Sequence, residues 1–289
     1  MVQFKQMSYQ LRVIKDNPVG FWPLDESSGS VAYDVSGCEN HGVYTGGLTT
    51  NIFPLVEGGV SGTIISSTKY ITVPASKDFT GSISGGTIGD KNSSDNDFTM
   101  EVWIYSKITS SGYTTIFADP VSDIGLFWDN GNIVFQVQNE RVEYTVPFYK
   151  RALHIVGSYS VSHLSLYVNG VLVVSKALED FEFTNESLSL QIGPTSSLSD
   201  SFIVDAPALY RYTLSGDKVA THYFESTPIT PLQIAGPDKG SIAYLTDRNI
   251  KQAYSKVYPR DKSFGNYLHD YLEVNLDKNY IGLIKTETS

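Results

Sequence analysis

Leu164-Ser-Leu-Tyr-Val-Asn-Gly-Val-Leu-Val-Val174 is the stretch that decides the fold. Its two short apolar runs are joined by Asn169-Gly170, which supplies the two residues with positive φ that a type I′ turn requires. Before the turn, Leu164, Leu166 and Val168 alternate with Ser and Tyr, the period of two that is typical of a strand with one buried face. The stretch therefore predicts a β-hairpin.

The same alternation recurs along the chain, and turn residues separate the runs at the short intervals that are typical of a sandwich or jelly roll. One helical pattern stands out, over residues 215–224, with Ser215 as a suitable N-cap. The predicted fold class is therefore all-β. Besides the hairpin and two short runs within 20–29 and 31–44, the expected strands cover 69–74, 98–105, 114–118, 124–128, 132–138, 153–159, 187–193 and 202–212.

Composition and punctuation predict three segments. Residues 1–17 form an N-terminal lead-in with room for one short amphipathic turn, and residues 18–227 form the main domain. Three prolines between Thr227 and Pro237 are typical of a linker. The remaining segment, 228–289, is too poor in apolar residues for a core of its own. We expect it to be a small β-rich extension that packs on a neighbour, either its own sandwich or another chain. Within it we expect a short helix at 247–256 and strands at 270–276 and 280–285.

Charge and cysteine content exclude several classes. The net charge of −10 argues against a nucleic-acid-binding surface, which needs a basic patch. The single cysteine, Cys38, cannot form an intrachain disulfide bond, and no loop carries the nucleotide-binding glycine pattern. No segment approaches the roughly 18 apolar residues of a membrane span, and the N-terminus lacks the apolar core of a signal peptide. We therefore expect neither membrane insertion nor a cleaved signal.

Four sequence motifs follow one another along the chain. They are Phe21-Trp-Pro-Leu-Asp-Glu-Ser-Ser-Gly29 with its continuation to Tyr44, Phe98-Thr-Met-Glu-Val-Trp-Ile104, His154-Ile-Val-Gly-Ser-Tyr159 with 164–170, and Leu190-Gln-Ile-Gly193 with 202–214 and Thr221-His-Tyr223. In this order they resemble the concanavalin A-like, laminin G-like jelly-roll family. The opening segment, with no signal peptide before it, is most similar to such modules in bacteriophage tail and virion proteins. The resemblance implies a jelly-roll β-sandwich over residues 18–227 and does not extend to residues 228–289.

The resemblance implies one structural calcium ion, because many jelly rolls of this type bind Ca²⁺ through oxygens near the opening loop and a late strand. The family often has a second acid where this chain has Ala206, which departs from the pattern. The residues at the matching positions are Asp25, Glu26, Asp34, Asn40 and Asp205. The alternative is that these side chains cap turns.

A glycan site is the second candidate. Sugar sites combine an aromatic ring with polar side chains, and Trp128-Asp129-Asn130-Gly131-Asn132 has this content. Tyr113, in a Ser-Ser-Gly-Tyr loop, is a further aromatic candidate. The alternative is that Trp128 packs in a sheet and that Asp129–Asn132 is only a hairpin turn.

A hydrolase is the third candidate. Relatives with this scaffold use carboxylates at alternate positions of one strand, and the nearest match is Glu179-Asp180-Phe-Glu182. This match lies between expected strands, and Glu101 is alone on its strand. Neither a nucleophile elbow nor metal-ligand spacing of the histidines is present, and His154 and His222 are expected to pack or to form hydrogen bonds.

The sequence thus predicts a non-enzymatic virion structural protein of the tail or capsid surface, which displays a lectin-like domain and aids host attachment. The expected partners are other virion proteins through residues 228–289, host-surface glycans and further copies of the chain. A carbohydrate-binding adhesin module of a bacterial surface protein is the alternative, and a glycoside hydrolase is the remote one.

Overall fold

The computed structural model describes eleven segments of the chain, and contacts divide the chain into two units, residues 1–226 and 227–289. In the second unit only the antiparallel strands β16 (Pro231–Ala235) and β17 (Ile242–Thr246) are described. The described residues are 9–47, 54–56, 62–80, 97–106, 112–146, 152–179, 181, 188–194, 202–226, 231–235 and 242–246.

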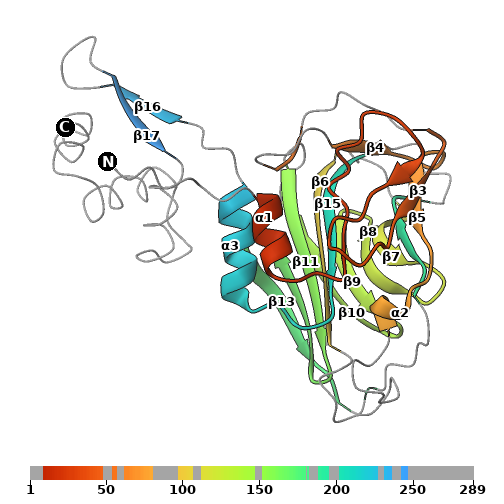
Figure 1. The fold of residues 1–289 in the computed structure, drawn as a ribbon. Helices are drawn as coiled ribbons and strands as arrows, with labels where there is room; N and C mark the ends of the chain where they lie inside the picture. Colours follow the sequence, from red (N-terminus) through yellow and green to blue (C-terminus); the bar gives the residue numbers. More distant parts are fainter. Residues whose placement is uncertain are drawn as a thin grey trace. The chain divides into compact units, whose positions relative to one another are not determined.

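The first unit is a sandwich of two antiparallel sheets (Figure 1), which confirms the predicted fold class. The seven-stranded sheet contains β1 (Gly20–Phe21), β4 (Thr63–Ile65), β6 (Phe98–Ser106), β11 (Ala152–Ser160), β12 (His163–Val168), β13 (Val171–Ala177) and β15 (Phe202–Tyr210). The eight-stranded sheet contains β2 (Val31–Ala32), β3 (Gly42–Thr45), β5 (Tyr70–Val73), β7 (Tyr113–Asp119), β8 (Ile124–Asp129), β9 (Asn132–Val137), β10 (Glu140–Thr145) and β14 (Leu190–Ile192). Their orders are β1-β15-β6-β11-β12-β13, with β4 pairing β15, and β10-β9-β8-β7-β14-β5-β3-β2.

The hairpin of the opening stretch forms as predicted. Strands β12 and β13 pair across Asn169 and Gly170, whose φ angles of 52° and 76° are those of a type I′ turn. Asn130 and Gly131 join β8 to β9 in the same way, with φ angles of 48° and 93°. The β8–β9 pair keeps one register along its length, whereas β12 and β13 shift register between Leu166 and Tyr167.

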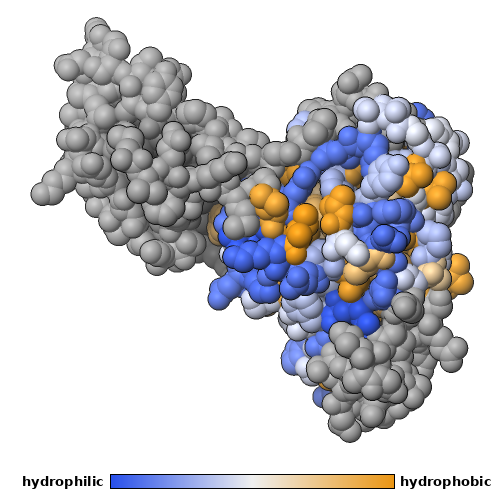
Figure 2. All heavy atoms as spheres, in the orientation of Figure 1, coloured by the Kyte–Doolittle hydropathy of each residue, from blue (hydrophilic) through white to orange (hydrophobic). Residues whose placement is uncertain are grey.

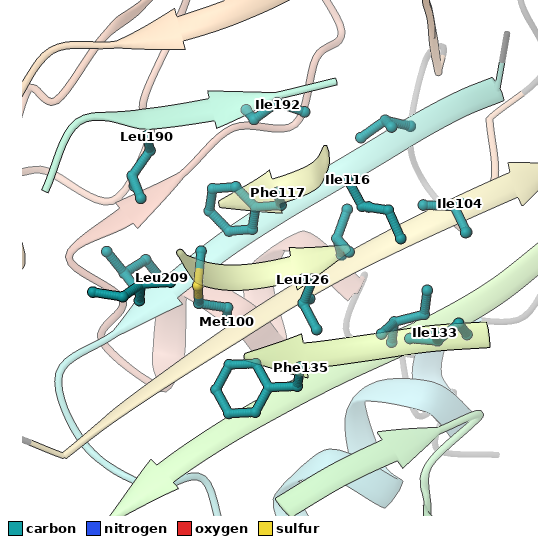
Figure 3. Close-up of a cluster of buried hydrophobic side chains, with 14 of the residues drawn as sticks. Met100, Ile104, Ile116, Phe117, Leu126, Ile133, Phe135, Leu190, Ile192 and Leu209 are labelled. Atoms are coloured by element: carbon teal, nitrogen blue, oxygen red, sulfur yellow. The ribbon is translucent and has the colours of Figure 1, made fainter. Parts of the chain in front are cut away.

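The main core lies between the sheets. Alternate residues of β6 and of the central strands of the other sheet point into this layer and are fully buried (Figure 3). The sheets approach closely at Gly157, where a Cβ would lie 2.2 Å from the Phe135 ring. The labelled core residues are Met100, Ile104, Ile116, Phe117, Leu126, Ile133, Phe135, Leu190, Ile192 and Leu209.

Two helices cover the outer face of the seven-stranded sheet, α1 (Tyr9–Lys15) and α3 (Gly216–Ser226), and they lie side by side in Figure 1. Helix α3 confirms the predicted helix, and the N–H of Lys218 donates to Oγ of Ser215 at 3.4 Å, as an N-cap requires. Figure 2 shows hydrophilic residues gathered on the exposed side of these helices, with a few apolar ones between them. The third helix, α2 (Lys77–Thr80), is a single turn.

The short amphipathic turn expected in the lead-in is helix α1, which buries Tyr9 and Val13 one turn apart in a second apolar cluster with residues of the sheet. Other predictions needed correction. Strands β4 and β10 were not predicted, and Pro231 begins a strand within the predicted linker, a position where its missing N–H is tolerated. The helix and strands expected after residue 246 lie outside the described residues.

Candidate functional site

The outer face of β7–β10 brings together four of the five residues predicted to bind glycan. Because side chains alternate along a strand, Asp129 points away from the core that its neighbour Trp128 enters. Tyr113 on β7 and Asn132 on β9 are the cross-strand partners of Asp129, so they share this face. Asn130 follows in the turn. We call these four residues, with Arg141, Glu143 and Thr145 of β10, the outer-face cluster.

Hydrogen bonds order the polar side chains of this cluster. The amide of Asn130 donates to Oδ1 of Asp129 at 2.8 Å, and Nη2 of Arg141 lies 3.2 Å from the other carboxylate oxygen, Oδ2. Arg141 also forms an ion pair with Glu143. The hydroxyl of Thr145 donates to Oδ1 of Asn132 at 2.7 Å. The cluster is therefore ordered before any ligand arrives, which lowers the entropic cost of binding.

Tyr113 provides the aromatic surface of the cluster. Its ring stacks on Phe127 with centroids 5.1 Å apart and an interplanar angle of 22°, and 41% of the residue is exposed. Partial burial, with the negative charge of Asp123, raises the pKa of Tyr113 to about 12, so its hydroxyl is neutral at physiological pH. One face of the ring is thus supported by protein, and the residue still meets solvent.

Trp128 lies on the opposite side of the strand and is only 1% exposed. It belongs to the core between the sheets. The prediction that this ring stacks on a sugar is therefore not supported. The alternative interpretation, sheet packing, is the one that the structure shows.

Sequence reasoning missed the β10 members of the cluster. In this strand, Arg141, Glu143 and Thr145 alternate with the buried Val142 and the core-facing Tyr144. That alternation, directly after the strand at 132–137, was the available signal. It is weakened by the small number of apolar residues in the strand, as is common on an edge strand.

The predicted calcium ligands of the opening loop are occupied by the chain itself. Oδ1 of Asp34 accepts the N–H groups of Phe21 and Ser36, each at 2.8 Å. Oδ2 of Asp34 accepts the Ser36 hydroxyl at 2.8 Å and the Asn40 N–H at 2.9 Å. The Asn40 amide donates to the carbonyl of Val19 at 2.7 Å. These contacts are those of turn capping.

The remaining predicted ligands make similar contacts. Glu26 accepts the N–H of Tyr33 and the hydroxyl of Tyr44, both at 2.7 Å, and Asp25 accepts the amide of Gln10 at 2.7 Å. Asp205 is buried and accepts the N–H of Leu55 at 2.7 Å.

Burial raises the pKa of Asp205 to about 8, so the carboxyl is mostly protonated at neutral pH. Its other oxygen, Oδ1, has no hydrogen-bond partner in the structure. Within the described part of the chain, no group of three or more His, Cys, Asp or Glu side chains is placed to hold a metal ion. The calcium ion stays a prediction.

Glu101 is the centre of a buried polar network on the other sheet, beneath α1 and α3. Its Oε1 accepts the hydroxyl of Tyr9 at 2.7 Å and lies 2.7 Å from Nε2 of His154. Its Oε2 accepts the hydroxyl of Tyr210 at 2.9 Å and lies 2.9 Å from Nδ1 of His222. Glu101 is fully buried, so a substrate cannot reach it in this conformation.

His222 links this network to α1. Its second nitrogen, Nε2, lies 3.0 Å from Oδ2 of Asp16, so both ring nitrogens face carboxylates and both donate. Burial alone would lower the pKa of His222, but Glu101 and Asp16 together raise it. Burial would likewise raise the pKa of Glu101, whereas the charge of His222 and hydrogen bonds from both histidines hold it well below its usual range. The expectation that His154 and His222 form hydrogen bonds is confirmed.

Of the acidic run at 179–182, Glu179 lies just after β13, and Asp180 and Glu182 lie outside the described residues.

None of the described helices combines the length and apolar character that crossing a bilayer requires.

Comparisons with known proteins agree with this fold. Residues 79–220 match the family model described as the concanavalin A-like lectin/glucanases superfamily. This match covers all strands from β6 to β15, including the outer-face cluster and Glu101. The comparison with curated protein sequences gives no significant match.

Among solved structures, the receptor binding domain of botulinum neurotoxin C/D mosaic serotype is 15% identical, with a TM-score of 0.60 over 76% of this chain and 56% of that chain. The binding domain of botulinum neurotoxin DC in complex with SialylT is 12% identical, with a TM-score of 0.60 over 76% of this chain and 54% of that chain. A botulinum neurotoxin type C structure, whose description states that cell entry depends on interaction with two ganglioside molecules, is 14% identical, with a TM-score of 0.59 over 82% and 63% of the two chains.

This chain therefore spans between 54% and 63% of the length of these three structures, and at such identities the likeness shows the fold alone. These structural neighbours are toxin domains rather than phage proteins. The sheet order, the family match and the structural likeness agree: the chain carries a jelly-roll domain of the concanavalin A-like lectin and glucanase fold.

Proposed function

We propose that the domain is a non-enzymatic glycan-binding module and that the outer-face cluster is its binding site. The observation that carries the proposal is the side-by-side placement of Tyr113, a half-exposed ring, and the ordered polar groups of Asp129, Asn130 and Asn132. A sugar offers an apolar face that fits such a ring, and its hydroxyls both donate and accept hydrogen bonds. Both halves of that recognition are present on one sheet face.

The chemistry of the polar groups fits hydroxyl ligands. Asp129 has two carboxylate oxygens that accept, Asn130 and Asn132 have amides that both donate and accept, and Arg141 donates only. Each of these side chains is held by a neighbour in the cluster. The described fold neighbours that bind SialylT or gangliosides support a glycan ligand by analogy of fold, which does not identify the site.

A virion location, docking through residues 228–289 and self-association stay predictions, as does the alternative of an adhesin on a bacterial surface. The described residues of the extension form one antiparallel pair, β16 with β17, and its docking on a neighbour rests on its small number of apolar residues. The glucanase branch of the superfamily is the second candidate class. Glu101 speaks against it, because the carboxylate is enclosed by four hydrogen-bond partners rather than open to a substrate.

A glycan array on the purified full chain tests the proposal, run in calcium and again in EDTA. We expect specific binding by the unmodified protein and loss of at least about tenfold in affinity, or about 1.4 kcal/mol, in Tyr113→Ala. Tyr33→Ala is the matched control, because Tyr33 is 52% exposed but follows β2 at the opposite edge of the same sheet. An equal loss in both variants, or an array without binding, would contradict the site.

The EDTA arm answers a separate question. Retained binding in EDTA would show that recognition needs no metal ion. Loss of binding in EDTA, restored by added calcium, would support the predicted ion.

A further inference from the structure

We infer that the outer-face cluster selects uncharged sugars and disfavours glycans that carry a carboxylate, such as those ending in sialic acid. This inference rests on the proposed function and names the ligand class of the same site. It departs from the ligands stated for the fold neighbours, whose descriptions name SialylT and gangliosides.

The charge of the cluster is the first argument. Asp129 and Glu143 lie on the same face as Arg141, and both form ion pairs with it. Asp123, in the turn before β8, acts on the Tyr113 hydroxyl through its negative charge. Carboxylates therefore outnumber the guanidinium around the ring, and a second anion placed there meets net repulsion. The chain as a whole, at −10, adds to that repulsion at low salt.

The engagement of Arg141 is the second argument. A carboxylated sugar is normally held by a guanidinium that can present its paired N–H groups. Here Nη2 of Arg141 already faces Oδ2 of Asp129 at 3.2 Å and the carboxylate of Glu143. Hydrogen bonding to Glu143 is the largest cause that raises the pKa of Arg141. Both contacts use Nη2, so an anion that bound the other N–H groups would share the guanidinium with two protein carboxylates and meet their repulsion.

Lys176, whose side chain reaches the start of β10 from the other sheet, is also engaged. Nζ of Lys176 on β13 lies 2.6 Å from Oε2 of Glu140, the first residue of β10. Among the residues that the structure describes, the cluster thus has no cation that is not already in an ion pair. The groups left to meet a ligand are the Tyr113 ring, two amides, a hydroxyl and carboxylate oxygens, which suit neutral hydroxyls.

The test compares pairs of glycans that are identical except for a terminal sialic acid. The pairs are printed on one array. The pair with the highest binding signal is then titrated calorimetrically against the full chain, once at about 20 mM NaCl and once at about 500 mM NaCl. We expect the neutral member to bind roughly three- to tenfold more tightly at low salt, the size of effect that exposed charges a few ångströms apart produce. High salt should narrow the difference.

Glu143→Gln removes one of the repelling charges and keeps the size of the side chain. We expect it to reduce the discrimination at least twofold by improving affinity for the sialylated member. Asp217→Asn is the control, because it makes the same change in net charge on the exposed side of α3, over the other sheet. It should leave the ratio unchanged.

Three outcomes would overturn the inference. Equal or tighter binding of the sialylated member would reject it while leaving the glycan function intact. An equal shift in the ratio from Glu143→Gln and Asp217→Asn would show that only total charge matters and not this cluster. Binding of neither member of any pair would reject the proposed function together with the inference.

Discussion

The outer faces of the two sheets use polar residues in opposite ways. On the seven-stranded sheet, α1 and α3 cover Glu101 and His154, and His222 of α3 points in to Glu101. The polar atoms of these three side chains mostly bond to one another. On β7–β10, Arg141 and Glu143 are ion-paired but about half exposed. Substituting a buried polar group lowers stability strongly, because its partner stays buried without a hydrogen bond and without water. An exposed ion pair contributes little to stability. The first face is therefore structural, and the second is available to a ligand.

Glu101→Ala should have the largest effect on stability. It leaves His154, Tyr9 and Tyr210 without their acceptor and His222 with Asp16 alone. We expect a loss of about 3–5 kcal/mol in the free energy of unfolding, measured by urea denaturation near pH 6. Glu101→Leu separates charge from cavity, since it fills the space. A loss under about 1 kcal/mol in both variants would contradict a structural role for this face.

The same network predicts a pH dependence with two limbs. The pKa of His222 is raised, so its contribution is complete below the unfolded value of about 6.5 and is lost as the pH rises through the folded value. The pKa values of Glu101 and Asp16 are lowered, so their contributions are present above about pH 4 and are lost as the pH falls through the folded values. These two limbs place the greatest stability between about pH 4.5 and 6.5. Burial lowers the pKa of His154, so the unfolded chain takes up a proton below about pH 6.5 that the folded chain does not, and this reduces the height of the maximum.

The alkaline limb has a second source, because the raised pKa of Asp205 also lowers stability as the pH rises towards about 8. The variants His222→Gln and Asp205→Asn separate the two sources in denaturation curves from pH 5 to 9. We expect each variant to flatten part of the limb. A limb unchanged in His222→Gln would refute the charged state of that histidine.

Arg141→Ala sharpens the contrast between the faces, because we expect it to change stability by less than about 1 kcal/mol. It removes the partner of Asp129 and Glu143, so the order of the cluster should be lost and glycan affinity should fall severalfold. Urea denaturation of one preparation gives the free energy of unfolding, and titration of the same preparation with glycan gives the affinity. A large loss of stability with unchanged affinity would reverse the assignment of the two faces.

Asp205→Asn should have the smallest effect when stability is measured near pH 4. At that pH the folded carboxyl is protonated and the unfolded one has begun to ionise only in part, so a neutral amide replaces a neutral acid and can still accept from Leu55. We expect a change within about 0.5 kcal/mol near pH 4, and a gain in stability over the unmodified protein as the pH rises towards about 8, because the amide does not titrate. If Asp205 instead binds calcium, the variant should remove a calcium-dependent rise in Tm, which differential scanning calorimetry would detect.

The fold was predictable because the inner layer imposes alternation on most strands. The type I′ turns at Asn169-Gly170 and Asn130-Gly131 fix the register locally, so short-range sequence sufficed. Strand β10 was missed because an edge strand needs few apolar residues. The short strand β4 was also missed, and the pairing of Ile65 with Phe202 depends on contacts far apart in sequence.

The candidate site was predictable only in part. The content of the β8–β9 turn indicated Asp129, Asn130 and Asn132, but the direction of Trp128 depends on which alternate residues enter the core. Glu101 was interpreted as alone on its strand, because its partners lie at positions 9, 154, 210 and 222. These residues come together only when α1 and α3 pack on the sheet, so their spacing in the sequence gives no sign that they are in contact.

Titration of the best-bound array glycan against Tyr113→Ala and Tyr33→Ala tests the central claim most directly. The account predicts that affinity falls at least about tenfold in Tyr113→Ala and stays within about twofold of the unmodified protein in Tyr33→Ala, with both variants folded. Unchanged affinity in folded Tyr113→Ala would place the binding site away from the outer face of β7–β10 and would contradict the account.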